Sequence, residues 1–397
     1  MPPDPAGTRH RLLLVTPYYP PHIGGVERYV ESLARELRRQ TDWTITIATS
    51  GEVRRRTTTV TTIDGITVYR LPWTHRLSNT PVSPSWPGLL TEILVRERPT
   101  LVNAHAPVPG LADLTARLCR TSPFVLTYHT GPMSKDRLGH ELLVTGYQRY
   151  VLPRTIRRAA AVITASDYVR EHLPAAPRGP VVTIHPGVDL GRFTPPDREQ
   201  TGTPPRALFV GSLDRAARYK NLPDLLRALR LLKADGLEIP LTVAGDGDAR
   251  RDHEVLARSL GLGSQVRFAG TLTGGALVTA YQESTVTVLP TLFESFATVL
   301  AEAMACGRPV IASETGGIPE LVRHGTNGLL VPPGDARKLA DAIETLGADT
   351  ALYRRLAVGA RTTATAHLDW RHQARVTADL FGQVAGRHAQ LGEMSTS

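Results

Sequence analysis

The sequence predicts an α/β protein built from two doubly wound domains, each with a parallel sheet. Short apolar runs alternate with longer amphipathic segments along the chain, which is typical of repeated βαβ units. A stretch rich in proline and without apolar periodicity, residues 193–205, separates two halves of similar size. The length of 397 residues also fits two domains, at roughly 100–200 residues per domain.

The expected elements follow one another in the βαβ order. In the N-terminal half, we expect strands at residues 11–16, 43–49, 66–71, 100–106, 124–129, 161–166 and 181–185. Between the first two strands, apolar residues recur at helical spacing from Val26 to Leu37, and the opposite face is charged. In the C-terminal half, we expect strands at residues 206–211, 240–244, 266–269, 286–290, 309–312 and 328–331, and helices at 222–235, 296–306 and 335–346.

These elements predict an N-terminal domain at residues 1–190, a linker at 191–205 and a C-terminal domain at 206–369. A last helical stretch, residues 370–391, has no strand after it. The sequence leaves open whether this helix crosses back onto the first domain. Open parallel sheets bind ligands beyond the carboxyl ends of their strands, so two facing sheets would place the site in a cleft between the domains.

The composition excludes several classes of protein. A hydrophobic share of 41% and a charged share of 21% exclude a disordered chain. Two cysteines, Cys119 and Cys306, cannot form a disulfide framework or a cysteine-ligated zinc site, which favours a reducing compartment. No segment approaches the ~18 apolar residues of a spanning helix, and the first apolar run ends at Pro17 like a strand rather than a signal peptide. We therefore expect a cytoplasmic protein.

The basic charge is concentrated in the N-terminal half. Residues 1–190 carry a net charge of +8 and residues 191–397 a net charge of +1. Such a half would attract anionic ligands, an anionic membrane surface or nucleic acid. Only four of the 46 basic residues are lysine, which favours a general bias towards arginine, and no nucleic-acid motif is present. Peripheral contact of this domain with the inner face of a membrane stays open, as does the oligomeric state.

Two segments could hold an anion at the start of a helix. The first strand leads through a proline-rich turn to Gly24 and Gly25, where backbone N–H groups can approach an anion, although a plain tight turn explains the glycines equally well. The second segment follows the strand at 286–290 and enters a helix, and its N–H groups near the helix start are free to bind a phosphate. Its residues are Ser295, Phe296, Ala297, Thr298 and Val299.

Two carboxylates flank this second segment. Glu294 lies at the end of the strand, and Glu302 lies eight residues further on, two turns into the helix. A carboxylate accepts two hydroxyl hydrogen bonds at once, so the pair suits a polyhydroxylated ligand. Taken singly, such glutamates are more often solvated charges on a helix.

The order of the surrounding motifs changes that interpretation. After the two glutamates come Gly307-Arg308-Pro309, Gly316-Gly317 and the run from Gly325 to Asp335. This string resembles the C-terminal domain of the retaining glycosyltransferases of family 4, which have the GT-B fold of two Rossmann-like domains facing across a cleft. Earlier pieces fit the same family over nearly the whole chain: Gly24-Gly25-Val26-Glu27, Asn103-Ala104-His105, Thr127 to Gly131, Pro186 to Asp189, Val210 to Leu213 with Lys220, and Ala244 to Gly247.

The resemblance implies a UDP- or GDP-linked sugar as donor, a hydroxyl-bearing acceptor, no cofactor and no metal ion. In that family Glu302 would bind the nucleotide ribose, Glu294 the hydroxyls of the donor sugar, and Lys220 the diphosphate. His129 would lie near the donor sugar and the acceptor, with His105 on the acceptor side. Acceptor identity would depend on the loops at 72–90 and 130–150, for which the sequence offers no transferable code.

Two positions depart from the family pattern. The family commonly has arginine where this chain has Ser212, so Arg215 or Arg218 in the same loop would have to supply the charge on the diphosphate. Ala297 stands where the family usually has glycine. The nearby Asp246-Gly247-Asp248 resembles a metal-binding pair, but its position after a strand indicates a turn.

Other classes of protein stay open beside a glycosyltransferase. A sugar-nucleotide epimerase can share the two-domain architecture, and so can a non-catalytic sugar-nucleotide sensor. A pyridoxal-dependent sugar phosphorylase is disfavoured because the chain has four lysines and no matching motif. A nicotinamide dehydrogenase is disfavoured because neither G-x-G-x-x-G nor a P-loop is present.

Overall fold

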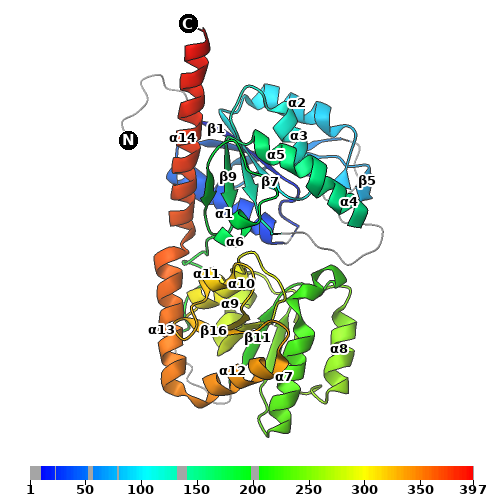
Figure 1. The fold of residues 1–397 in the computed structure, drawn as a ribbon, viewed down its shortest axis with the longest axis vertical. Helices are drawn as coiled ribbons and strands as arrows, with labels where there is room; N and C mark the ends of the chain where they lie inside the picture. The colour runs from blue at the N-terminus through cyan, green and yellow to red at the C-terminus, as the bar shows by residue number, and fades with distance from the viewer. Residues whose placement is uncertain are drawn as a thin grey trace. The chain divides into compact units, whose positions relative to one another are not determined.

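The computed structural model describes residues 10–22, 24–51, 57–77, 80–131, 141–197 and 205–396. The chain forms two compact units, one of residues 1–185 with 370–397 and one of residues 186–369 (Figure 1). Each unit contains a parallel sheet with helices, so the predicted α/β class is confirmed. The predicted linker at 191–205 lies inside the second unit, and its residues 198–204 are outside the described part of the chain.

The first unit is built on an eight-stranded sheet of order β10-β9-β8-β7-β1-β2-β4-β3. All neighbouring strands are parallel except β3, which runs antiparallel to β4 at the edge of the sheet. The strands are β1 (Arg11–Thr16), β2 (Thr44–Ser50), β3 (Thr59–Ile63), β4 (Ile66–Leu71), β7 (Leu101–Ala106), β8 (Phe124–Tyr128), β9 (Ala161–Thr164) and β10 (Val181–Thr183).

The sequence missed β3 and the small hairpin of β5 (His75–Leu77) and β6 (Thr80–Val82). Strand β3 reads Thr-Val-Thr-Thr-Ile and is largely exposed, so it lacks the apolar run that marks the inner strands. An exposed edge strand carries little of the burial pattern on which sequence-based prediction depends.

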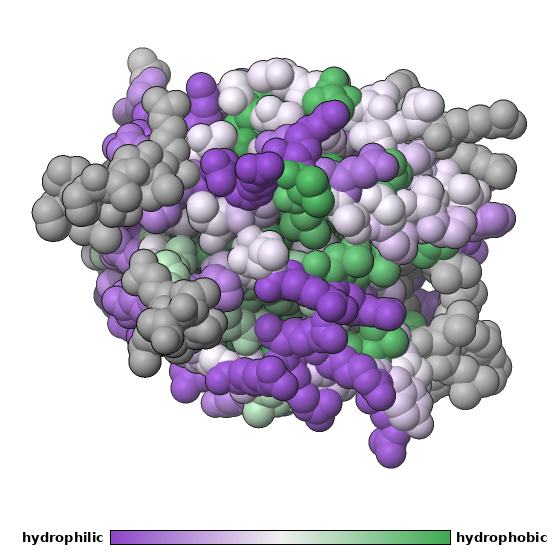
Figure 2. Space-filling model, turned by 90° about the horizontal axis from the view of Figure 1, so that it is seen from above, coloured by the Kyte–Doolittle hydropathy of each residue, from purple (hydrophilic) through white to green (hydrophobic). Residues whose placement is uncertain are grey.

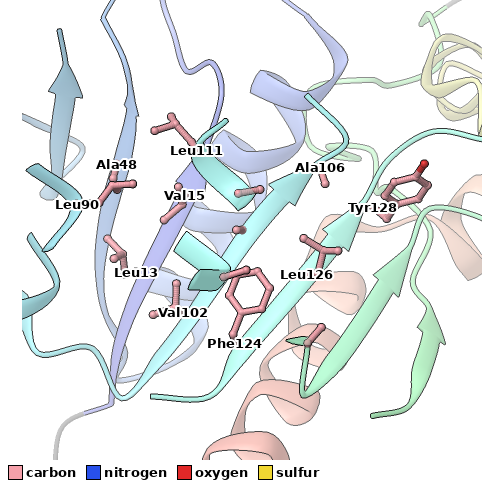
Figure 3. Packing of buried hydrophobic residues seen from close by; sticks show 14 of the residues in the cluster. Leu13, Val15, Ala48, Leu90, Val102, Ala106, Leu111, Phe124, Leu126 and Tyr128 are labelled. Atoms are coloured by element: carbon pink, nitrogen blue, oxygen red, sulfur yellow. The ribbon is translucent and has the colours of Figure 1, made fainter. Parts of the chain in front are cut away.

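The helices of the first unit enclose two cores, one on each face of the sheet. They are α1 (Gly25–Gln40), α2 (Trp86–Glu97), α3 (Leu111–Leu118), α4 (Glu141–Gly146), the π-helix η1 (Tyr147–Val151), α5 (Leu152–Arg158) and α6 (Asp167–Glu171). Successive residues of a strand point to opposite faces, and β1 shows this directly. Leu13 and Val15 enter one core with Phe124 and Leu126 (Figure 3), and Leu12 and Leu14 enter the other.

The last helix, α14 (Trp370–Thr396), belongs to the first unit. It packs against α1 and buries Trp370, Ala374, Phe381 and Val384 in the core that contains Leu12 and Leu14. The chain therefore returns to its N-terminal unit after completing the second one, which the sequence alone left open.

The second unit has a six-stranded parallel sheet of order β13-β12-β11-β14-β15-β16. Each predicted strand of this half corresponds to one observed strand, with ends that differ by at most one residue. The strands are β11 (Ala207–Val210), β12 (Leu241–Ala244), β13 (Val266–Gly270), β14 (Val286–Leu289), β15 (Val310–Ser313) and β16 (Gly328–Val331). The helices are the 3₁₀ helix η2 (Arg215–Lys220), α7 (Leu222–Ala234), α8 (Arg250–Ser259), α9 (Gly274–Glu283), α10 (Thr298–Ala305), α11 (Ile318–Leu321), α12 (Ala336–Ala348) and α13 (Thr350–His367).

Among the described residues, large apolar side chains are exposed in several different elements. In the view of Figure 2, hydrophobic groups lie in separate clusters between hydrophilic ones. Exposed examples in different elements are Val60, Val95 and Val358, and scattered exposed residues of this kind are ordinary in folded proteins. None of the helices in the described ranges is both long enough and apolar enough to cross a membrane.

Candidate active site

The two predicted catalytic residues of the second unit lie at the switch point of its sheet. From β11 the chain proceeds to β12 and β13 on one side, whereas β14, β15 and β16 lie on the other. Ligands of doubly wound sheets bind at the carboxyl ends of the strands where the order reverses, which here is between β11 and β14. The segment after β11 carries Lys220, and the segment after β14 carries Glu294.

Lys220 and Glu294 form an ion pair across this point. The Nζ atom of Lys220 donates to the carboxylate of Glu294, and their side chains are only 17% and 16% exposed. Burial acts to lower the pKa of Lys220, but the neighbouring Glu294 carboxylate outweighs it, so that the pKa of Lys220 is raised. The ammonium group therefore keeps its charge at neutral pH, next to a carboxylate that it holds in place.

Backbone contacts hold the two segments together. The carbonyl oxygen of Tyr219 accepts a hydrogen bond from the Leu292 N–H at 2.7 Å and from Thr291 Oγ1 at 2.9 Å. Thr291 is completely buried, and its hydroxyl also contacts the carbonyl of Phe293 at 2.7 Å. Hydrogen bonds therefore join the backbone next to Lys220 to the segment that leads to Glu294.

The glycine pair at 316–317 supports Glu294 from the other side. The N–H of Gly317 donates to the Glu294 carbonyl at 2.9 Å. Gly316 has a φ of +56°, and a Cβ atom at this position would lie 2.0 Å from that same carbonyl oxygen. A side chain at 316 would therefore displace the backbone that carries Glu294, which explains the need for glycine in this motif.

Helix α10 carries the second carboxylate, Glu302. Its side chain is nearly buried, and Tyr281 Oη of α9 donates to Glu302 Oε2 at 2.8 Å. Tyr281 is itself fully buried, so it orients the carboxylate rigidly. Tyr281 is not among the residues predicted from the sequence, because nothing in its local pattern distinguishes it from a core aromatic residue.

The start of α10 differs by two residues from the predicted helix at 296–306. Ala297 caps the helix with a φ of +64°, a left-handed conformation that favours glycine and costs other residues about 1–2 kcal/mol. Ser295 and Phe296 lie before the cap and are buried, while Thr298 and Val299 begin the first turn. The Leu300 N–H donates to the Ala297 carbonyl at 2.9 Å. The N–H groups of Thr298 and Val299 precede this first hydrogen bond of the helix, and we expect them to be available to an anion.

The loop after β11 is packed backbone to backbone against the turn after β12. A Cβ atom on Gly245 would lie 1.8 Å from the Gly211 carbonyl oxygen, and Gly247 has a φ of +158°. Asp246 pairs with Arg250 at 3.1 Å, and Asp248 Oδ1 accepts from the Arg215 N–H at 2.6 Å. Both aspartates therefore use their side chains for contacts around this turn. Among the described residues there is no group of three or more His, Cys, Asp or Glu side chains that could hold a metal ion.

The two arginines proposed to replace the family arginine differ in their contacts. Arg215 uses its guanidinium to pair with Asp252 of α8 at 2.9 Å. Arg218 is exposed, and among the described residues its guanidinium contacts only the Arg215 carbonyl, at 3.5 Å. Ser212 itself bonds to Asp214 at 2.8 Å. The geometry therefore favours Arg218 over Arg215 as the side chain that can turn to a ligand.

We expect Arg218→Ala to lower kcat/KM for transfer by about tenfold, the equivalent of one charged contact of roughly 1.4 kcal/mol. Arg215→Ala should have a smaller effect, because its charge is already engaged by Asp252. Steady-state kinetics of the two matched variants at fixed acceptor concentration measure the difference. A larger loss for Arg215→Ala would reverse the assignment.

In the first unit, His105 and His129 lie at the ends of the adjacent strands β7 and β8. His105 Nδ1 and His129 Nε2 are 2.8 Å apart, and the rings are stacked with centroids 5.1 Å apart. Tyr29 of α1 packs edge-on against both rings. Burial lowers the pKa of His129 to about 4. Burial, and then the neighbouring His129, lower the pKa of His105 well below its usual value, so both imidazoles are neutral at pH 7.

Gly24 caps α1 and Gly25 is its first residue, and both lie beside Glu27, a carboxylate for which the sequence predicts no separate role. A Cβ atom on Gly24 would lie 2.4 Å from Glu27 Oε2. Glu27 is buried and pairs with His22 Nδ1 at 2.5 Å, a hydrogen bond that raises the pKa of His22. Close packing of Glu27 is thus one physical reason for Gly24, and anion binding by the glycine pair stays a prediction.

Comparison with known proteins is consistent with this geometry. Residues 23–192 match the family model "Glycosyltransferase Family 4", and residues 193–363 match "Glycosyl transferases group 1". The chain is 30% identical over 365 residues to D-inositol 3-phosphate glycosyltransferase 1 of Catenulispora acidiphila, covering 85% of each chain. It is 36% identical over 241 residues to the enzyme of that name from Streptomyces bingchenggensis, covering 57% of this chain and about half, 52%, of the relative.

Solved structures share the arrangement of strands and helices over almost the whole chain. Sucrose-phosphate synthase from Thermosynechococcus elongatus superposes with a TM-score of 0.78 at 24% identity, covering 96% of this chain and 100% of that one. Anabaena Alr3699/HepE in complex with UDP-glucose superposes with a TM-score of 0.73 at 20% identity, covering 94% and 99%. At these identities the likeness establishes the fold.

Proposed function

The chain belongs to the group 1 glycosyltransferases of family 4, and on this premise we propose that it transfers a sugar from a nucleoside-diphosphate sugar to an acceptor hydroxyl. The observation that carries the proposal is the half-buried Lys220–Glu294 pair at the switch point between β11 and β14. It places a compact cation and a carboxylate side by side, one suited to a diphosphate and the other to sugar hydroxyls.

Each charged group has a distinct part in the proposed donor site. Lys220 stabilises the charge that develops on the diphosphate as the glycosidic bond breaks, and Arg218 and the N–H groups at the start of α10 add to this stabilisation. Glu294 accepts hydrogen bonds from the donor sugar, and Glu302, held by Tyr281, accepts them from the nucleotide ribose. His129 lies near the donor sugar and the acceptor, and the buried His105 acts on the acceptor side through its contact with His129.

We propose that transfer retains the anomeric configuration and uses no metal ion. The acceptor oxygen attacks the anomeric carbon on the face from which the diphosphate leaves. The bond from that carbon to the phosphate oxygen breaks, and the departing phosphate oxygen takes the acceptor's hydroxyl proton. The rate then depends on charge stabilisation and alignment rather than on a protein nucleophile.

The names of related proteins support a proposal for the substrate class. UDP-glucose bound to the Anabaena neighbour supports a UDP-linked hexose as donor. Relatives named D-inositol 3-phosphate glycosyltransferase support a phosphorylated polyol as acceptor. The net charge of +8 on residues 1–190 suits an anionic acceptor of that kind.

A thermal-shift screen against UDP- and GDP-linked sugars tests the donor. At a ligand concentration 100 times Kd, a bound donor raises the melting temperature by roughly 5–10 °C. The stabilising donor is then incubated with D-inositol 3-phosphate, and the anomeric proton of the product is followed by NMR. Retained configuration supports the proposal, and an inverted product refutes the retaining mechanism.

The same experiment separates the alternatives that share this fold. A sugar-nucleotide epimerase would convert the donor without any acceptor. A non-catalytic sugar-nucleotide sensor would give the thermal shift but no turnover with any hydroxyl acceptor. Only a glycosyltransferase releases nucleoside diphosphate in proportion to glycosylated acceptor.

We further propose that the segment Tyr147–Arg158 contacts an anionic membrane surface at the inner face of the membrane. Its exposed basic side chains are Arg149, Arg154, Arg157 and Arg158, it has no acidic residue, and Tyr150 and Val151 are exposed beside them. Exposed arginines and an interfacial tyrosine together suit anionic headgroups.

Co-sedimentation with vesicles containing phosphatidylglycerol tests this contact. Binding should fall steeply as the salt concentration rises, because screening shortens the range of the attraction. Arg149→Gln/Arg157→Gln should bind roughly 30-fold more weakly than the wild type, at about 1 kcal/mol for each of the two charges removed. Equal binding to neutral phosphatidylcholine vesicles, or binding that the double variant leaves unchanged, contradicts the proposal.

A further inference from the structure

The hydrogen bond between His105 and His129 orders the protons of both rings. A neutral imidazole carries one ring proton, and one of the two nitrogens that face each other at 2.8 Å must donate it. The direction of this hydrogen bond decides the tautomer of His129. It therefore decides whether the other ring nitrogen of His129, Nδ1, is a donor or an acceptor for a substrate.

The burial of His105 settles the direction of this bond. Only 1% of its surface is exposed, and its Nε2 atom is buried without a hydrogen-bond partner among the described residues. A proton on Nε2 would be a buried donor with no acceptor, whereas a proton on Nδ1 finds His129 Nε2 at 2.8 Å. The proton of His105 therefore lies on Nδ1, and His105 is the donor.

We infer that His105 is a positioning residue that holds His129 in its Nδ1–H tautomer. Because His129 Nε2 accepts from His105, the single proton of His129 is on Nδ1, which is left as a donor for a substrate oxygen. This inference rests on the proposed function for its catalytic meaning, but the tautomers themselves do not depend on it.

Aromatic packing holds the rings of His105 and His129 in this orientation. The ring of Tyr29 packs edge-on against both histidines, with its centroid 4.9 Å from that of His129 and 5.8 Å from that of His105. Trp370, the first residue of α14, packs edge-on against Tyr29 at 5.1 Å. The returning C-terminal helix therefore supports the histidine pair through one intervening ring.

Histidine-selective ¹⁵N labelling of the full chain gives the direct test. Long-range ¹H–¹⁵N spectra distinguish the tautomers, and variants of His105 and His129 assign their signals among the 13 histidines. We expect both residues in the Nδ1–H form, which is the minor tautomer of free histidine. His129 in the Nε2–H form in the wild-type protein would overturn the inference.

A matched pair of amide variants tests the role of His105. The amide nitrogen of His105→Asn lies near the position of Nδ1, so it can still donate to His129, whereas that of His105→Gln lies near the position of Nε2. We expect kcat within threefold of the wild type for His105→Asn, and a loss of at least tenfold for His105→Gln with the donor KM changed less than twofold.

The outcomes separate this inference from the proposed function. If no donor and acceptor support transfer, the proposed function fails, while the NMR signature still decides the tautomer of His129. If His105→Gln shows the Nε2–H form of His129 and a folded melting transition, the positioning role stands. If His105→Asn and His105→Gln behave alike in both tautomer and kcat, His105 acts only through packing and the inference is wrong.

Discussion

Replacing Lys220 by alanine is expected to lower kcat for sugar transfer by about 10²–10³-fold, the usual cost of removing one group that stabilises transition-state charge. The variant loses the cation nearest Glu294 and leaves that carboxylate unpaired at the switch point. Initial rates with saturating donor and acceptor, followed by release of nucleoside diphosphate, measure the loss.

Two control variants separate charge from folding. Lys220→Arg keeps a positive charge but replaces the compact ammonium by a planar fork, and should recover part of the rate. Lys233→Ala removes another of the four lysines, one that lies on α7 and pairs with Glu238, and should leave kcat unchanged. Full activity of Lys220→Ala, with a normal melting transition, would remove Lys220 from the mechanism.

Replacing Phe381 by alanine should lower the free energy of unfolding of the first unit by about 3–5 kcal/mol. Phe381 is fully buried on α14 and packs near the ring of Trp43, at a centroid distance of 6.1 Å. Removing it leaves a cavity between the returning helix and the sheet. Urea unfolding followed by tryptophan fluorescence reports the change, since Trp43 and Trp370 both lie in this core or packed against it.

An exposed position on the same helix provides the comparison. Gln383→Ala lies on the solvent side of α14 and should change the free energy of unfolding by less than about 0.5 kcal/mol. A loss below about 1 kcal/mol for Phe381→Ala would mean that α14 contributes little to the first unit, contrary to the packing of its buried residues.

The inner strands could be predicted because each is a short, continuous apolar run. Strands β1, β14 and β15 are buried on both faces, which leaves a signal in the sequence that needs no knowledge of the partner strand. Strand β3 is exposed at an edge and has no such signal. The start of α10 was placed two residues early because the left-handed conformation of Ala297 is not visible in an apolar pattern.

The family motif located Lys220 and Glu294, and the topology of the sheet explains why residues 74 positions apart meet. Adjacent parallel strands end at the same edge, so the segments after β11 and β14 must be neighbours. The sequence could not decide between Arg215 and Arg218, because the choice depends on Asp252, which belongs to another helix.

By itself, the sequence determined the α/β class, the order of the inner strands along the chain and the family, because these follow from local periodicity and from motifs in a set order. Only the tertiary structure decided the path of α14, the support of Glu302 by Tyr281, the pairing of Glu27 with His22 and the hydrogen bond between the two histidines. Each of these contacts joins side chains from different elements, or from different turns of one segment. Their distance and burial depend on how those elements pack, and that information is not carried by any single stretch of sequence.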